Sequence, residues 1–266
     1  MSQQLTISRE HLAGNRRMII ARSIAASMAG VFPVPVVEEW MASSITRSMV
    51  KRIAESHAVD MDDAAIRMIA DGPAAPPSWT KLAGGTLVFK MMGRAWRKLL
   101  ITYLVARRTR AAARYFQINT LFDHYCARLH VGLGLDAKSA EQLRTLIGAA
   151  IDQTPGNVGN DIFRRSAMAA AKATVRAPLN LLDTVSGGFV RKLLSRGSDE
   201  VEAIAEVDQR LDTELQHKRG FLARTTAAVE LQLSTTGNPY VEELVDNFER
   251  LWREHPGESH DDERKH

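Results

Sequence analysis

Apolar residues recur at every fourth position through one stretch of the chain, and this spacing constrains the fold more than any other feature of the sequence. The residues of this series are Val37, Met41, Ile45, Met49 and Ile53. A period close to 3.6 places such side chains on one face of an α-helix, which must then pack against another element. The sequence therefore predicts a helix here with a buried face.

Prolines separate this helix from the one before it. A helix capped by Ser8 must end near Gly30, because Pro33 and Pro35 cannot continue the backbone hydrogen-bond ladder. Residues 167–194 repeat this arrangement loosely around one proline, Pro178 in place of Pro33. This similarity has two equally good explanations: an internal repeat of one helical hairpin, or chance similarity between alanine-rich helices.

The remaining segments also favour helices. Aromatic residues make up only 6% of the chain, and runs of β-branched residues are scarce. Further helices are expected at residues 60–70, 79–130 (as a hairpin), 136–154, 161–175, from 198 onwards and at 240–254. Asp136 and Ser139 are the candidate N-caps of the helix at 136–154, and Asn238 and Pro239 are the predicted N-cap and N1 residues of the last helix. The predicted fold class is all-α, a multi-helix bundle built from proline-broken helical hairpins.

Two stretches with turn-forming residues suggest boundaries along the chain. One lies at residues 72–77 and contains one glycine and three prolines, and the other lies at residues 154–160 and is rich in glycine and asparagine. They divide the chain into an N-terminal helical hairpin region (1–71), a basic helical hairpin region (79–154), a C-terminal acidic helical region (161–254) and a polar, disordered tail (255–266). These regions could equally form one domain.

Cysteine use and the N-terminus favour a cytoplasmic protein. Cys126 is the single cysteine and cannot form an internal disulfide, and residues 1–15 lack the pattern of a signal peptide. The apolar stretch at residues 23–37 is short for a membrane span, and the one at residues 82–106 carries four basic residues. The expected location is the cytoplasm, including the inner face of the membrane. The alternative is that these apolar stretches form a helical hairpin that inserts partly into the lipid.

Charge is divided along the chain. Residues 72–122 contain nine basic residues and no acidic one, whereas residues 199–266 contain seventeen acidic and eight basic residues, a net charge of about minus nine. In one interpretation the acidic helices dock on the basic ones within the fold. In the other, the basic surface meets an anionic partner.

The basic segment supplies the candidate binding residues. In regular helices Lys90, Arg94 and Arg97 share one face, and Arg107, Arg110 and Arg114 share another, beside apolar residues. The residues predicted to bind an anionic partner are Lys90, Arg94, Arg97, Lys98, Arg107, Arg108, Arg110 and Arg114.

A membrane surface or a protein partner suits this segment better than nucleic acid does. Its apolar share is high, and its basic residues are not interleaved with stacking aromatics. Nonspecific binding of nucleic acid through the same helices is the second hypothesis.

Motifs for catalysis are missing. Neither a phosphate-binding loop nor a dinucleotide fingerprint occurs in the sequence. The nearest approach to a metal site is Asp123, His124, Cys126 and His130, which we interpret as a buried cysteine with partly exposed histidines. Paired acids such as Asp62–Asp63 and Glu242–Glu243 are expected to stabilise helix starts. We predict no catalytic, cofactor-binding or metal-ligating residue; an enzyme with an unfamiliar helical site is the third hypothesis.

Residues 18–70 resemble a known helical module. The small-residue helix, Pro33-Val34-Pro35, and an amphipathic helix ending near His57 are similar to an uncharacterised bacterial module that accompanies some Era-like GTPases, and to EcsC-type proteins. The resemblance implies a membrane-associated or GTPase-partner element without catalytic residues. The leading expectation is a non-enzymatic helical protein that acts at the cytoplasmic membrane surface or on a partner such as a separately encoded GTPase.

Overall fold

The computed structural model of the 266-residue chain describes residues 10–29, 35–73, 94–155, 161–166, 208–209, 211–213, 215–216, 220–234 and 239–255. These residues are almost entirely helical, so the predicted all-α class is confirmed. The helices are α2 (His11–Ala29), α3 (Pro35–Ser56), α4 (Asp63–Asp71), α5 (Arg94–Arg128), α6 (Ala137–Gln153), α11 (Phe221–Leu233) and α12 (Tyr240–Glu254). The predicted tail beyond residue 255, the linker at residues 74–77 and the possible repeat around Pro178 lie outside the described residues.

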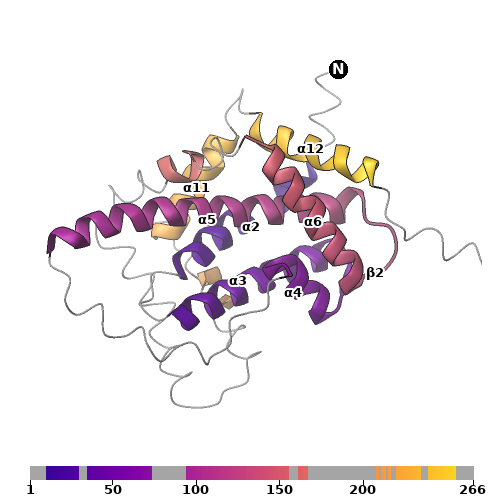
Figure 1. Cartoon of the computed structure of the whole chain (residues 1–266), viewed down its shortest axis with the longest axis horizontal. Coiled ribbons are helices and arrows are strands. Elements are labelled where there is room, and N and C mark those ends of the chain that lie inside the picture. Colours follow the sequence, from indigo (N-terminus) through magenta and orange to yellow (C-terminus); the bar gives the residue numbers. More distant parts are fainter. Residues whose placement is uncertain are drawn as a thin grey trace, which may run out of the picture.

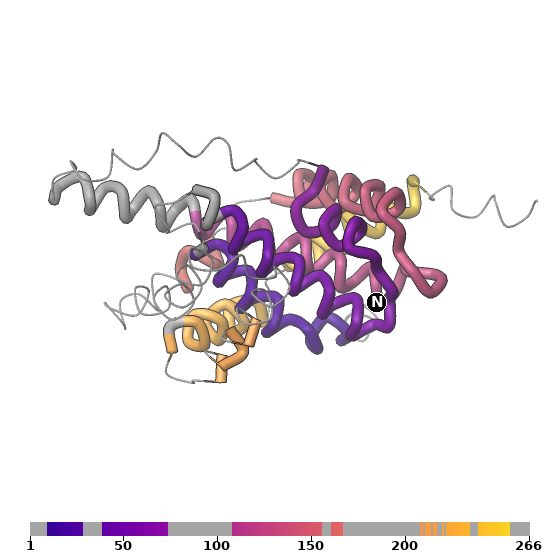
Figure 2. The backbone as a smooth tube through the Cα atoms, turned by 90° about the horizontal axis from the view of Figure 1, so that it is seen from below, coloured from indigo at the N-terminus to yellow at the C-terminus, as the bar shows by residue number. Residues whose placement is uncertain are grey.

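Helices α2 and α3 form the predicted pair of helices around the proline-containing break. Pro35 is the first residue of α3, a position where proline is tolerated because its missing N–H has no helical partner. The predicted face of α3 is buried at Met41, Ile45, Met49 and Ile53. Figure 2 shows α2 and α3 side by side, and their Cα atoms approach closely along the pair.

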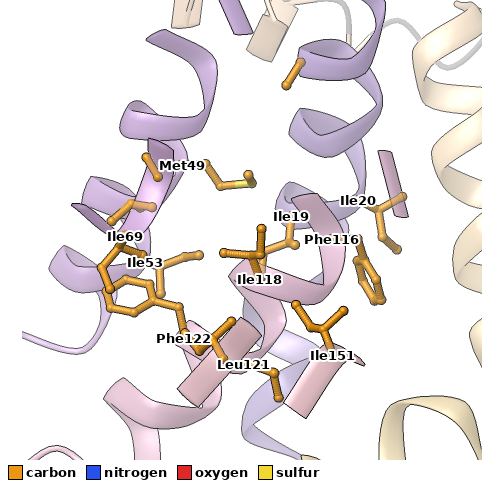
Figure 3. Close-up of a cluster of buried hydrophobic side chains, with 14 of the residues drawn as sticks. Ile19, Ile20, Met49, Ile53, Ile69, Phe116, Ile118, Leu121, Phe122 and Ile151 are labelled. Atoms are coloured by element: carbon orange, nitrogen blue, oxygen red, sulfur yellow. The ribbon is translucent and has the colours of Figure 1, made fainter. Parts of the chain in front are cut away.

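Helix α5 is the central element of the bundle (Figure 1). Its 35 residues form one continuous helix, so residues 94–128 contain no turn of the hairpin that the sequence predicts for 79–130. Residues 79–93, the rest of that predicted hairpin, lie outside the described residues. The buried side chains of α5 pack against those of α2, α3, α4 and α6 (Figure 3). The residues in this contact are Phe116, Ile118, Leu121 and Phe122 of α5, Ile19 and Ile20 of α2, Met49 and Ile53 of α3, Ile69 of α4 and Ile151 of α6.

One hydrophobic cluster continues from these side chains into the C-terminal helices. It includes Leu211, Leu222 of α11, and Leu244 and Phe248 of α12. Side chains on both sides of the predicted boundaries at 72–77 and 154–160 therefore share one core. Burying such apolar surface is the dominant favourable term in folding.

A short parallel bridge pins two loops together, and the sequence did not suggest it. β1 (Asp60–Met61) pairs with β2 (Gly134–Leu135), and the Asp60 N–H also donates to the carbonyl of Leu133 at 2.8 Å. The bridge explains why α4 begins at Asp63 with Asp62 as its N-cap, later than the expected start at residue 60.

The starts of α6 and α12 agree with the sequence to within one residue. Asp136 caps α6 as expected and accepts from the Ser139 N–H at 2.8 Å, so Ser139 is the donor and not a second cap. Pro239 is the N-cap of α12, whereas the sequence predicted it as the first helical residue, N1. Within the described residues, no helix combines the length and the apolar character that crossing a bilayer requires.

Candidate anionic-partner interface and buried polar clusters

Five of the eight predicted binding residues lie where side chains are not described. Lys90 is outside the described residues altogether. Arg94, Arg97, Lys98 and Arg107 belong to the backbone of α5, whose described side chains begin at Arg108. The remaining three arginines divide between two sides of the helix.

Arg108 lies on the side of α5 that faces α2. Its Nη1 donates to the carbonyl oxygen of Ser27 at 2.7 Å, and its side chain is partly buried. A contact of this kind satisfies a backbone acceptor near the C-terminal end of α2. Arg108 therefore helps to hold α5 against α2.

Arg110 and Arg114 are exposed on another side of α5, and we call these two residues the α5 arginine face. They are one turn apart, and the position of Arg107 precedes them on the same side. Arg114 Nη1 lies 3.2 Å from Asp152 Oδ1 of α6, in a pair whose side chains are 46% and 71% exposed. An ion pair this exposed contributes little, about 0–1 kcal/mol, so it holds Arg114 only weakly.

A third arginine adds positive charge near this face. Arg144 of α6 is partly buried, and burial, followed by the charge of Arg114, lowers its pKa. Its guanidinium covers Gly72: a Cβ at this position would lie 3.9 Å from Nε and Nη2 of Arg144. The charge of Arg114 therefore reaches Arg144, and the charge of Asp71 opposes its effect on the pKa of Arg144.

Two described aspartates of the acidic C-terminal segment pair with arginines of the N-terminal helices. Asp208 and Asp212 contact Arg22 of α2 and Arg52 of α3, at distances from 2.7 to 3.2 Å. We call these four residues the arginine–aspartate clamp. Docking of acidic on basic residues within the fold is thus found, with partners from α2 and α3 in place of the expected α5.

A second polar cluster surrounds Asp123, and sequence reasoning missed it. Asp123 Oδ1 accepts from Asn15 Nδ2 at 2.7 Å and lies 2.8 Å from His57 Nε2. Asp123 is buried, so this carboxylate joins α2, the end of α3 and α5 in a region of low dielectric. Asn15 also donates to Ser56 Oγ at 2.8 Å.

Three further side chains, one each from α2, α5 and α12, lie in a row. His11 Nε2 lies 3.1 Å from His124 Nδ1, and His124 Nε2 lies 3.1 Å from Glu249 Oε1. His124 is fully enclosed and also meets the ring of Phe248 edge to face, with centroids 6.4 Å apart. Through Glu249, one acidic residue of the C-terminal region thus reaches the middle segment of the chain.

The four residues that the sequence analysis considered as metal ligands do not share one set of contacts. Asp123 and His124 belong to the contacts just described, Cys126 is a buried free thiol, and His130 Nδ1 lies 3.1 Å from the Tyr125 hydroxyl. Among the described residues, no group of three or more His, Cys, Asp or Glu side chains is placed to hold a metal ion. The expected buried cysteine is found, but His124 is more deeply buried than expected.

The acid pairs lie at helix starts as expected. Asp62 caps α4 by accepting from the Ala65 N–H at 2.6 Å, and Asp63 lies in the first turn. Glu242 and Glu243 occupy the first turn of α12. Carboxylates in these positions stabilise the positive end of the helix dipole.

Cys126 is expected to resist thiol reagents while the protein is folded. Burial, followed by the charge of Asp123, raises the pKa of its thiol well above the usual range, so that the reactive thiolate is scarce at pH 8. Alkylation by iodoacetamide at pH 8 should be at least about a hundredfold slower than in denaturant. Equal rates in both states would show that the thiol is accessible in the native protein.

Comparison with known proteins gives no assignment: no family model, no curated protein and no solved structure matches this chain.

Proposed function

We propose that this protein is a non-enzymatic helical protein that binds anionic membrane surfaces through the α5 arginine face, at the cytoplasmic side of the membrane. The observation that carries the proposal is the exposure of Arg110 and Arg114 on one side of the longest described helix. The described aspartates 208 and 212 engage Arg22 and Arg52, and so do not neutralise this face.

Electrostatics favours such binding at low ionic strength. Each Lys or Arg close to an anionic surface contributes about 1 kcal/mol, and the attraction falls off within a Debye length, about 10 Å at 0.1 M salt. The sequence continues the same helix through Arg94, Arg97, Lys98 and Arg107 with no acidic residue. The resemblance of residues 18–70 to a module that accompanies Era-like GTPases supports a membrane-associated role, with such a GTPase as a proposed partner.

The test is flotation with liposomes of anionic or neutral lipid across a salt series. Wild-type protein should float with anionic liposomes at low salt and be released as salt rises, since screening weakens the attraction. The double variant Arg110→Glu and Arg114→Glu reverses the charge of the α5 arginine face and should lose at least about tenfold in affinity, because four units of charge change at the surface.

A matched control distinguishes the effect of the α5 arginine face on binding from the effect of the protein's net charge. Arg67 of α4 and Arg224 of α11 are exposed, and the variant Arg67→Glu and Arg224→Glu changes net charge by the same four units. It should retain most of the anionic-liposome binding. Equal loss in both double variants, or no flotation of the wild type at any salt, would overturn the proposal. A mobility-shift assay with DNA and RNA at low salt tests the nucleic-acid alternative.

A further inference from the structure

The arginine–aspartate clamp is built around a guanidinium that is completely enclosed. Arg22 has 0% of its side chain exposed, and its Nη2 lies 2.8 Å from Asp208 Oδ1 and 3.2 Å from Asp212 Oδ1. Burial lowers the pKa of Arg22 and the two aspartates oppose that effect. A buried cation costs several kcal/mol in desolvation unless its neighbours compensate it well.

The compensation of Arg22 is incomplete. Its Nε and Nη1 are buried and make no hydrogen bond in the described structure. Guanidinium carries five N–H donors, of which the contacts with Asp208 and Asp212 use only those on Nη2. Unsatisfied buried donors of this kind are rare in native proteins, and they leave Arg22 with N–H groups that a further acceptor could use.

The other two donors of the site come from α3. Arg52 Nε donates to Asp208 Oδ2 at 2.9 Å, and its Nη2 lies 2.8 Å from Asp212 Oδ2. Ser48 Oγ donates to Asp208 Oδ1 at 2.6 Å. Two guanidinium groups and a hydroxyl therefore converge on one point between α2 and α3, and four carboxylate oxygens of the chain itself occupy it.

This donor set also suits a tetrahedral oxyanion. Arginine forks and hydroxyl groups are common ligands of phosphate, whose several oxygens can accept from more than one guanidinium at once. We propose that Arg22, Arg52 and Ser48 form a phosphate-binding site, for inorganic phosphate or a phosphomonoester, and that Asp208 and Asp212 are its displaceable internal occupants.

The edge of the site is open enough for exchange. Arg52 is 40% exposed and Asp212 is 37% exposed, so an anion can reach Arg52 from solvent and replace Asp212 before Asp208. Tethered aspartates compete at an effective concentration of millimolar order, so free phosphate should act on the wild type at millimolar concentrations. Displacement would release the segment around Leu211, which otherwise packs in the core.

Hydrogen exchange of the wild-type protein is the first experiment. Sodium phosphate should accelerate amide exchange at residues 208–216 several-fold relative to sodium chloride of equal ionic strength, with little change in α6 and α12. Chloride screens charge to the same extent but cannot bridge two guanidinium groups. The same exchange rates in both salts would overturn the proposal, whatever the behaviour of any variant.

The second experiment removes the internal occupants. In the variant Asp208→Asn and Asp212→Asn, phosphate titrated in a thermal-shift or calorimetric assay should bind at least about tenfold more tightly than in the wild type, because competition is abolished. The control variant Asp60→Asn and Asp63→Asn changes charge equally at two exposed aspartates outside the clamp and should bind phosphate as the wild type does. Equal phosphate affinity in the two double variants would also count against the site.

Vesicles distinguish the source of the phosphate group. Phosphatidic acid presents a phosphomonoester, whereas phosphatidylserine vesicles matched for surface charge do not. Faster exchange at residues 208–216 with phosphatidic acid alone would assign a lipid headgroup, and an effect of inorganic phosphate alone would assign a free ligand. The variant Arg110→Glu and Arg114→Glu should retain the response to inorganic phosphate, so this inference and the proposed membrane function fail separately.

Discussion

Replacing Phe248 with alanine is expected to lower the free energy of unfolding by about 3–5 kcal/mol, the usual cost of removing a fully buried aromatic side chain. Phe248 has 0% of its surface exposed and lies on the apolar face of α12, between His124 of α5 and Trp252 of its own helix. The loss combines the transfer of apolar surface with a cavity that the surrounding helices fill only in part.

Urea denaturation followed by circular dichroism measures this change and also tests how α12 is joined to the rest of the protein. Because Phe248 belongs to the same hydrophobic cluster as α2, α3 and α5, the variant should unfold in one transition with a lower midpoint. Arg253→Ala, at an exposed position of the same helix, should change stability by less than about 0.5 kcal/mol. Two separate transitions in the Phe248 variant would show that α12 belongs to an independent unit.

Local patterns in the sequence were enough to predict the helices that have one polar face. The four-residue spacing of α3 predicted its buried side from Met41 to Ile53, and the first-turn acids of α12 marked its start. Such features depend on residues within a few turns of one another, so tertiary contacts are not needed to recognise them. Asp136 as the cap of α6 was predicted for the same reason.

Helix α5 shows where this reasoning stops. Its enclosed side includes Gln117, Asn119, Asp123 and His124, so burial and polarity do not separate along the helix. Gln117, for example, donates to the buried hydroxyl of Tyr240 in α12, and burial raises the pKa of that tyrosine to about 12. A hydrophobic pattern cannot identify a buried face whose polar groups are satisfied by distant partners.

The candidate site was predicted only in part for a related reason. Arg108 and Arg110 are two residues apart and equally basic, yet one donates to Ser27 of α2 and the other is exposed. Packing decides which side of a basic helix contacts its neighbour. That packing depends on the neighbouring helices as well as on the sequence of the basic helix itself. The arginine–aspartate clamp joins residues up to 190 positions apart, and neither of its arginines lies in the segment that the charge division emphasised.

Replacing Asp123 with alanine should destabilise the protein by about 2–4 kcal/mol, because two buried or partly buried donors would lose their acceptor at once. The Asp123 carboxylate accepts from Asn15 of α2 and lies within hydrogen-bond distance of His57 at the end of α3. Asp123→Asn keeps one acceptor oxygen of the same shape and should therefore cost less than the alanine variant.

Equilibrium denaturation at pH 7 measures both Asp123 variants, with Asp152→Ala as the matched control. Asp152 is another aspartate in a side-chain pair, but its pair with Arg114 is exposed, so its loss should change stability by less than about 1 kcal/mol. A double-mutant cycle between Asp123→Ala and Asn15→Ala should show coupling of about 0.5–3 kcal/mol. If Asp123→Ala costs no more than Asp152→Ala, the Asp123 cluster does not hold the junction of α2, α3 and α5 together, and its polar side chains would then be free for a role in binding.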